Sequence, residues 1–104
     1  MRSPNDAERN LSAPETLGLD TRVEIRKSAI KLLEEMPEGV GRLVIDFSAT
    51  RHVDSAGLGA LMLIQRRAAE RRQTVALRNV SEEIRFLLVL TKLDDLFQME
   101  APVG

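Results

Sequence analysis

Apolar residues along the chain alternate between helical and extended spacing. From Thr21 onward, apolar side chains recur every three or four residues as far as Met36, and charged side chains fill the positions between them. This spacing predicts an amphipathic helix. Thr21 followed by Glu24 fits a capping box at the helix start, and Pro37 predicts the helix end.

The rest of the chain continues this alternation. The run Leu43–Phe47 is apolar and β-branched, which predicts a strand covered on both faces. Helical spacing returns from Asp54 to about Arg72, Thr74–Arg78 predicts another strand, and Ser81 is the predicted N-cap of a further helix. Such an alternation is typical of an α/β domain. We expect a central mixed sheet of about four strands packed with three to four helices.

The two ends of the chain are polar and contain proline. Residues 1–14 are therefore predicted to be a flexible leader or a poorly formed first strand, and residues 101–104 a flexible tail. Between them, residues 15–100 are expected to form one domain. Within this domain, Glu15–Leu19 is long enough for one brief strand.

Composition narrows the classes of function. The net charge is −1 with acids and bases interspersed, which gives no electrostatic case for direct nucleic-acid binding. The chain has no cysteine, so disulfides and thiolate metal sites are excluded. No apolar run is long enough to span a bilayer, and the first residues are polar. We therefore expect a cytoplasmic protein that does not insert into membranes.

The candidate chemistry lies in the segment Asp54-Ser55-Ala56-Gly57-Leu58-Gly59, which follows a predicted strand and begins a predicted helix. Backbone N–H groups at a helix start lack partners, and the helix dipole is positive there. The amides of Ala56, Gly57 and Leu58 are therefore predicted to receive a phosphate carried by the Ser55 hydroxyl.

A simpler interpretation of the same segment is structural. Ser and Asp are common N-caps, so either Asp54 or Ser55 would only cap the helix. The two glycines would only allow close packing between helix and strand. The residues by themselves leave both interpretations open.

Three segments resemble the STAS domain family of bacterial anti-sigma factor antagonists, namely Leu43–Ser48, Val53–Gly59 and Leu93–Phe97. The resemblance implies a small STAS-type fold, and it implies that Ser55 is the residue phosphorylated by a partner kinase. The next position in the family is often Ser or Thr, whereas this chain has Ala56.

The front of the chain departs from the family pattern. Family members usually have two strands before the element matched by Leu19-Asp20, and the segment available here is short and polar. The first hairpin is therefore expected to be reduced or absent.

The resemblance implies a regulatory binding protein that is not an enzyme and needs no cofactor of its own. Its partner would be an anti-sigma factor, itself a GHKL-type serine kinase that uses ATP and magnesium. Phosphorylation of Ser55 would end the interaction, and a phosphatase would restore it. The predicted partner-binding residues are Asp54, Ser55, Ala56, Gly57, Leu58, Met62 and Asp20. The pattern leaves open whether Leu58 and Met62 are exposed or whether the second helix is fully buried.

Two other functions compete with this one. The first is a STAS-domain regulatory subunit that binds a transporter or lipid-trafficking ATPase without phosphorylation. The second is a small hydrolase that uses Ser55, but the only histidine, His52, is more simply a solvated loop residue than its base. A cluster of Asp20, Asp46 and Asp54 could hold magnesium, although caps and strand ends explain these carboxylates more simply.

Overall fold

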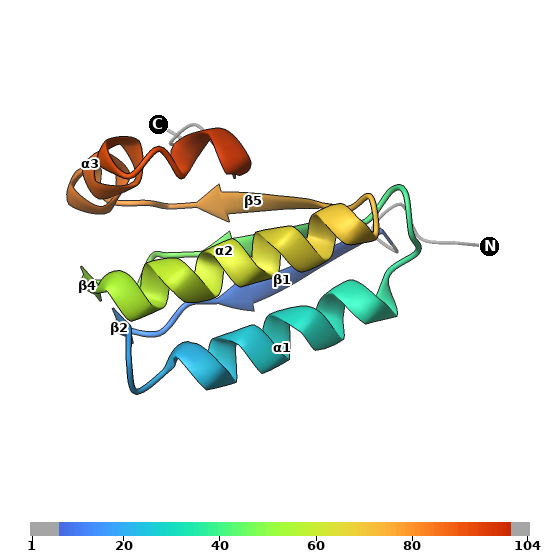
Figure 1. Ribbon diagram of the computed structural model, residues 1–104, viewed down its shortest axis with the longest axis horizontal. Helices are drawn as coiled ribbons and strands as arrows, with labels where there is room; N and C mark the ends of the chain where they lie inside the picture. Colours follow the sequence, from blue (N-terminus) through green and yellow to red (C-terminus); the bar gives the residue numbers. More distant parts are fainter. Residues whose placement is uncertain (1–6, 101–104) are drawn as a thin grey trace.

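A four-stranded sheet forms the centre of the computed structural model, which describes residues 7–100 (Figure 1). Its strands are β1 (Glu8–Ser12), β3 (Arg42–Asp46), β5 (Thr74–Arg78) and β6 (Gln98–Met99), in that spatial order. The α/β class and the expected four strands are confirmed. All three strand pairs are parallel rather than mixed, because a helix lies between each strand and the next in this sheet.

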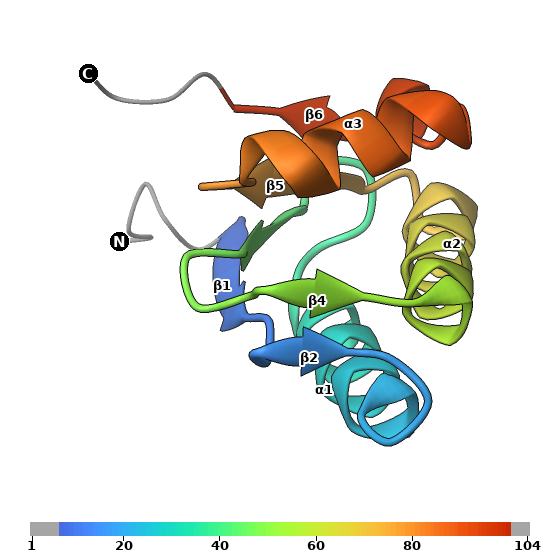
Figure 2. The ribbon, with the colours of Figure 1, turned by 90° about the vertical axis from the view of Figure 1, so that its left-hand side faces the viewer.

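The helices are α1 (Arg22–Glu35), α2 (Ser55–Glu70) and α3 (Glu82–Leu90), followed by a short 3-10 helix, Asp94–Leu96. Helices α1 and α2 lie side by side, while α3 lies next to β5 and β6 (Figure 2). The core between the helices and the sheet includes Ile25, Leu33, Leu43, Ile45, Leu61, Ile64, Val75, Leu77 and Leu88. None of the helices within residues 7–100 is long and apolar enough to cross a membrane.

The strand β1 answers one question that the sequence left open. Residues 1–14 were expected to be a flexible leader or a poorly formed first strand, and within them Glu8–Ser12 form a strand that pairs in register with β3. Their polar side chains look unstructured in sequence because they bind side chains that are distant along the chain: Glu8 accepts a hydrogen bond from Arg42, and Asn10 accepts one from Arg78. Residues 1–6 and the expected tail, 101–104, lie outside the described residues.

Val44 and Ala76 are buried but do not belong to the main core, and strand alternation puts them on the same face of the sheet as Arg42 and Arg78. Glu100 accepts hydrogen bonds from Arg42 at 2.6 Å and from Arg78 at 2.7 Å. The hydrogen bonds from Arg78 and Arg42, in that order, lower the pKa of Glu100 to about 2. These bonds therefore link Glu100 to the strands β3 and β5.

A second, two-stranded sheet positions the starts of α1 and α2. Its strands β2 (Thr16–Leu17) and β4 (His52–Val53) are parallel, so the brief strand expected within Glu15–Leu19 is confirmed. The predicted capping box at Thr21 is wrong, because its hydroxyl makes no cap hydrogen bond. That hydroxyl accepts from the amide of Gly18 and donates to the carbonyl of Thr16 instead. Because β1 and β2 belong to different sheets, they form no hairpin within residues 7–100.

Candidate functional site

Asp54 is the residue that caps helix α2. Its Oδ1 accepts a hydrogen bond from the amide of Gly57 at 2.9 Å, and its Oδ2 accepts one from the amide of Leu19 at 3.2 Å. The hydrogen bond from Gly57 contributes most to lowering the pKa of the Asp54 carboxyl, and the bond from Leu19 contributes next. The carboxylate is therefore ionised at neutral pH, and it joins the start of α2 to the turn that precedes α1.

Gly57 is required by the close approach of α2 to β2. A Cβ at Gly57 would collide with the backbone carbonyl of Leu17, whereas a Cβ at Gly59 would meet nothing within 4 Å. The interpretation that a glycine allows close helix–strand packing therefore holds for Gly57 and not for Gly59.

Ser55 is the first residue of α2 and is exposed. Its hydroxyl has no hydrogen bond to any other residue between 7 and 100. Because Asp54 is the N-cap, Ser55 is left without that structural task. The structural interpretation, an N-cap, thus applies to Asp54, whereas the phosphorylation interpretation concerns Ser55.

Two of the three amides that were predicted to receive a phosphate, those of Gly57 and Leu58, are already hydrogen-bonded. The amide of Gly57 donates to Asp54 Oδ1, and the amide of Leu58 donates to the Asp54 carbonyl at 3.0 Å. The amide of Ala56 also helps to lower the pKa of Asp54. Two of the three predicted backbone donors therefore already bind Asp54, which a sequence containing two possible caps did not reveal.

A groove of about 420 Å³ lies beside Ser55, between α1 and α2. It is lined by Arg22, Arg26, Ser55, Ala56, Gly59, Ala60, Met62, Leu63 and Arg66. Met62 is 46% exposed and Leu63 is 42% exposed. Of the two apolar residues considered for this surface, Met62 is therefore available to a partner, whereas Leu58 is half-buried and packs against the core.

The groove is positively charged. Arg22, Arg26 and Arg66 form no ion pair or hydrogen bond with any described residue, 7–100. Other arginines, such as Arg42 and Arg78, are paired with Glu100. The charge of Arg22 also contributes to the low pKa of Asp54. The site thus combines a free hydroxyl, exposed apolar side chains and unpaired arginines.

A family model described as the MlaB, STAS domain matches residues 5–99. The chain belongs to the STAS domain family. This match confirms the family resemblance seen in the sequence, and it includes β1, which that resemblance did not reach.

The STAS fold is also present in solved structures. A Thermotoga maritima protein assigned as an anti-sigma factor antagonist has a TM-score of 0.78 at 21% identity, over 94% of this chain and 82% of that one. The anti-sigma factor antagonist SpoIIAA, in its unphosphorylated form, has a TM-score of 0.70 at 14% identity, over 98% and 86%. A sulfate transporter family protein from Wolinella succinogenes has a TM-score of 0.71 at 15% identity, over 89% and 76%. At these identities the likenesses show the fold alone.

A sequence relative has the same domain. A STAS-domain containing protein of Pseudomonas aeruginosa (strain UCBPP-PA14) is 31% identical over 58 residues, which are 56% of this chain. The matched region spans 57% of that protein.

The other carboxylates of this STAS domain do not gather around Ser55. Asp46 accepts hydrogen bonds from the amide of Ser48 and the side chain of Asn79. No group of three acidic, histidine or cysteine side chains within the described part of the chain could hold a metal ion. The cluster of Asp20, Asp46 and Asp54 is therefore not formed, although Asp20 is exposed in the turn joined to Asp54.

His52 is exposed on β4 and lines a different hollow, together with Thr50, Arg51, Ser81, Glu82 and Glu83. It makes no hydrogen bond with Ser55. A serine nucleophile needs a base within hydrogen-bond reach. The described residues therefore provide no Ser–His pair at this site.

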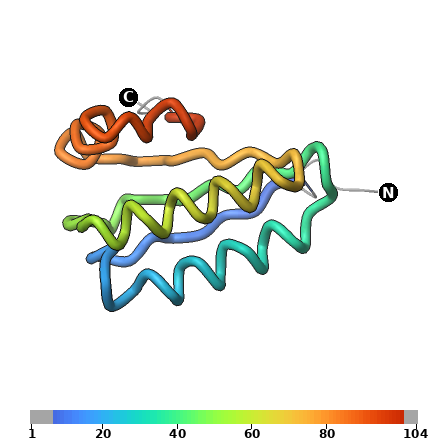
Figure 3. Tube along the Cα trace, viewed as in Figure 1, coloured from blue at the N-terminus to red at the C-terminus, as the bar shows by residue number. Residues whose placement is uncertain are grey.

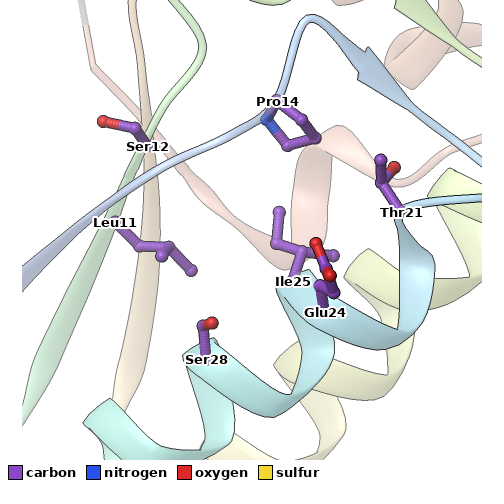
Figure 4. A pocket seen from close by; sticks show the side chains of 7 residues that line it. All are labelled: Leu11, Ser12, Pro14, Thr21, Glu24, Ile25 and Ser28. Atoms are coloured by element: carbon purple, nitrogen blue, oxygen red, sulfur yellow. The ribbon is translucent and has the colours of Figure 1, made fainter.

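A second hollow, of about 170 Å³, lies on another side of α1, next to the edge strand β1 (Figure 4). Its lining residues are Leu11, Ser12, Pro14, Thr21, Glu24, Ile25 and Ser28. Sequence patterns did not indicate this hollow, because its residues come from two segments that share no motif. It is smaller than the pockets that hold drug-sized ligands.

Proposed function

We propose that this STAS domain is an anti-sigma factor antagonist whose partner binding ends when Ser55 is phosphorylated. The partner would be an anti-sigma factor that is itself a GHKL-type serine kinase. The bound partner would release its sigma factor, and a phosphatase would regenerate the unmodified protein. The domain acts in this proposal as a regulatory binding protein and not as an enzyme.

The observation that carries the proposal is the position of Ser55. Its hydroxyl is exposed and unbonded within the described residues, so a kinase can reach it without opening the fold. It also lines the same groove as the exposed side chains of Met62 and Leu63. A flexible methionine beside a polar site suits protein recognition. A partner bound to this groove would therefore contact the residue that it modifies.

The predicted partner-binding residues divide into two groups on this basis. Ser55, Ala56 and Met62 line the groove, and Asp20 is exposed in the turn next to it. These residues are proposed to contact the partner directly. Asp54, Gly57 and Leu58 are proposed to act by holding α2 and its first turn in place.

Phosphorylation would change the charge of this surface. A phosphoserine carries about −1.5 to −2 charges at neutral pH. Unpaired arginines attract an acidic partner, and a phosphate among them would both cancel that attraction and repel acidic groups. Like charges placed across an interface cost several kcal/mol, which is enough to switch binding off.

Incubation with candidate anti-sigma kinases from the same genome, with ATP and magnesium, tests the proposal. Mass spectrometry should locate one phosphate on Ser55, and the Ser55→Ala variant should remain unmodified. Ser48→Ala is a matched control, because Ser48 is exposed but lies outside α2 and does not line the groove, and it should be modified like the parent. Phosphate on another residue, or on none with every kinase, contradicts the proposal.

A second candidate function is favoured by the likeness to the sulfate transporter family protein, whose structure covers 89% of this chain. A transporter or a lipid-trafficking ATPase would then bind the domain without phosphorylation. The two candidates differ in their response to Ser55→Asp. This change should abolish binding by an anti-sigma factor, whereas a constitutive subunit would be recovered with its transporter or ATPase in both forms.

A further inference from the structure

A phosphate on Ser55 would find two of the first-turn amides of α2 already occupied. The amides of Gly57 and Leu58 bind Asp54, and the Asp54 carboxylate is itself ionised. A phosphate on the next residue would therefore lie beside a negative charge. Like charges disfavour each other, so cations close to this point would stabilise the phosphorylated form.

Such cations are present on α1. Helices α1 and α2 run side by side and begin at the same end of the molecule (Figure 3). Arg22 is the first residue of α1, and its charge already acts on Asp54. Arg26 follows four residues later on the same face of the helix. Both line the groove with Ser55, and both lack an ion pair within the described residues.

The third arginine of the groove is too distant. Arg66 lies on α2, as Ser55 does, and follows it by eleven positions. At a rise of about 1.5 Å per residue, their backbones are roughly 16 Å apart. This separation exceeds the distance of about 8 Å over which exposed charges interact strongly at physiological salt. Arg66 therefore serves as an internal control.

We propose that Arg22 and Arg26 form an intramolecular binding site for the phosphate of phosphorylated Ser55. The inference rests on the proposed function for the phosphorylation itself. Guanidinium groups bind phosphate through two parallel hydrogen bonds, so the two arginines hold the phosphate against α1 while the fold stays closed. The phosphate then occupies the same cations that an acidic side chain of the partner would use.

This competition explains how one modification acts on an exposed surface. In the unmodified protein the groove presents Met62 together with two arginines that form no ion pair within residues 7–100. In the phosphorylated protein these cations are neutralised by the chain itself. The partner segment that fits the unmodified groove is consequently an acidic one with apolar side chains.

The test uses protein with phosphoserine placed at position 55 by genetic code expansion, so that no kinase is needed. The pKa of the phosphate is read from its ³¹P chemical shift as a function of pH. Arg22→Gln/Arg26→Gln should raise this pKa by about 0.5 units or more, because the arginines favour the dianion. Arg66→Gln/Arg67→Gln removes the same charge from the far part of α2 and should leave it within about 0.2 units of the parent.

Equal phosphate pKa values in the parent and in Arg22→Gln/Arg26→Gln would overturn the inference, and so would equal shifts in the two double variants. Thermal unfolding of each variant verifies that the fold is retained. The result is separable from the proposed function. If the phosphate pKa shifts but no kinase modifies Ser55, the arginine site is supported and the phosphorylation switch is rejected. If a kinase modifies Ser55 but the phosphate pKa does not shift, the switch is supported and the arginine site is rejected.

Discussion

The carboxylate of Asp54 accepts a hydrogen bond from the amide of Leu19, which lies 35 residues earlier in the chain, at 3.2 Å. The other oxygen of the same carboxylate caps α2 through Gly57. One side chain therefore fixes the turn that leads into α1 relative to the helix start that presents Ser55. The bridge thus links the turn just before Arg22 to the residue just before Ser55.

Removal of the Asp54 carboxylate should loosen both elements. Asp54→Ala is expected to lower the thermal midpoint by several degrees, because a lost N-cap destabilises a helix end. Asp54→Asn keeps an acceptor for the Gly57 amide and should cost less. Amide hydrogen exchange should accelerate at Gly57 and Leu19 in the alanine variant. Unchanged exchange at Leu19 would show that the bridge does not hold the turn.

The two glycines of α2 should respond oppositely to the same substitution. Gly57→Ala is expected to destabilise the protein by about 2 kcal/mol, because the new methyl group meets the rigid backbone carbonyl of Leu17. Gly59→Ala meets open space and should stabilise the helix by about 0.5–1 kcal/mol. Urea unfolding measures both effects. Equal effects at the two positions would contradict the described approach of α2 to β2.

The Glu100 network should make stability depend on acid pH. The pKa of Glu100 is lowered from 4.5 to about 2, so its contribution is complete above about pH 4.5 and is lost as the pH falls towards about 2. Glu100→Gln should therefore be less stable than the parent at pH 7, by at most about 1 kcal/mol because the pair is partly solvated.

Urea unfolding at pH 7, 4 and 2 measures this difference, which should narrow and vanish towards pH 2. Glu34→Gln provides the control, because Glu34 is exposed and forms no ion pair within residues 7–100. A constant difference between Glu100→Gln and the parent at all three pH values would show that the carboxylate is not held by the arginines.

The exposed apolar side chains of the groove should contribute to partner affinity but little to the free energy of unfolding. Met62→Ala with Leu63→Ala is expected to weaken binding of the anti-sigma kinase by about tenfold or more, because truncated side chains at a binding hot spot cost over 1 kcal/mol. Val40→Ala truncates another exposed side chain, 65% exposed, outside the groove and should bind normally. Equal affinities for both would place the interface elsewhere.

The sequence predicted those elements whose residues satisfy each other locally. The strand β5 was predicted within its observed bounds, and the start of α2 at Asp54 and Ser55 followed from common capping preferences. The strand β1 was left undecided between a leader and a poor strand, because its polar residues are stabilised by Arg42 and Arg78, which lie on other strands. Pattern recognition within one segment does not contain that information.

The candidate site was predicted only in part, because some of its contacts join segments that are distant in sequence. The exposed position of Ser55 could be inferred from one segment, but two of the amides predicted to receive a phosphate bind Asp54 instead. Arg22 and Arg26 were indistinguishable in sequence from the solvated face of an amphipathic helix. Only the packing of α1 beside α2 places them in one groove with Ser55.

Titration calorimetry decides whether Ser55 is a phosphorylation switch. It compares the affinity of an anti-sigma kinase for the unmodified domain with its affinity for the domain that carries phosphoserine at position 55. The unmodified domain and Ser55→Ala should both bind, and the phosphorylated domain should bind at least about a hundredfold more weakly. Equal affinity for the unmodified and phosphorylated forms would contradict a switch at Ser55.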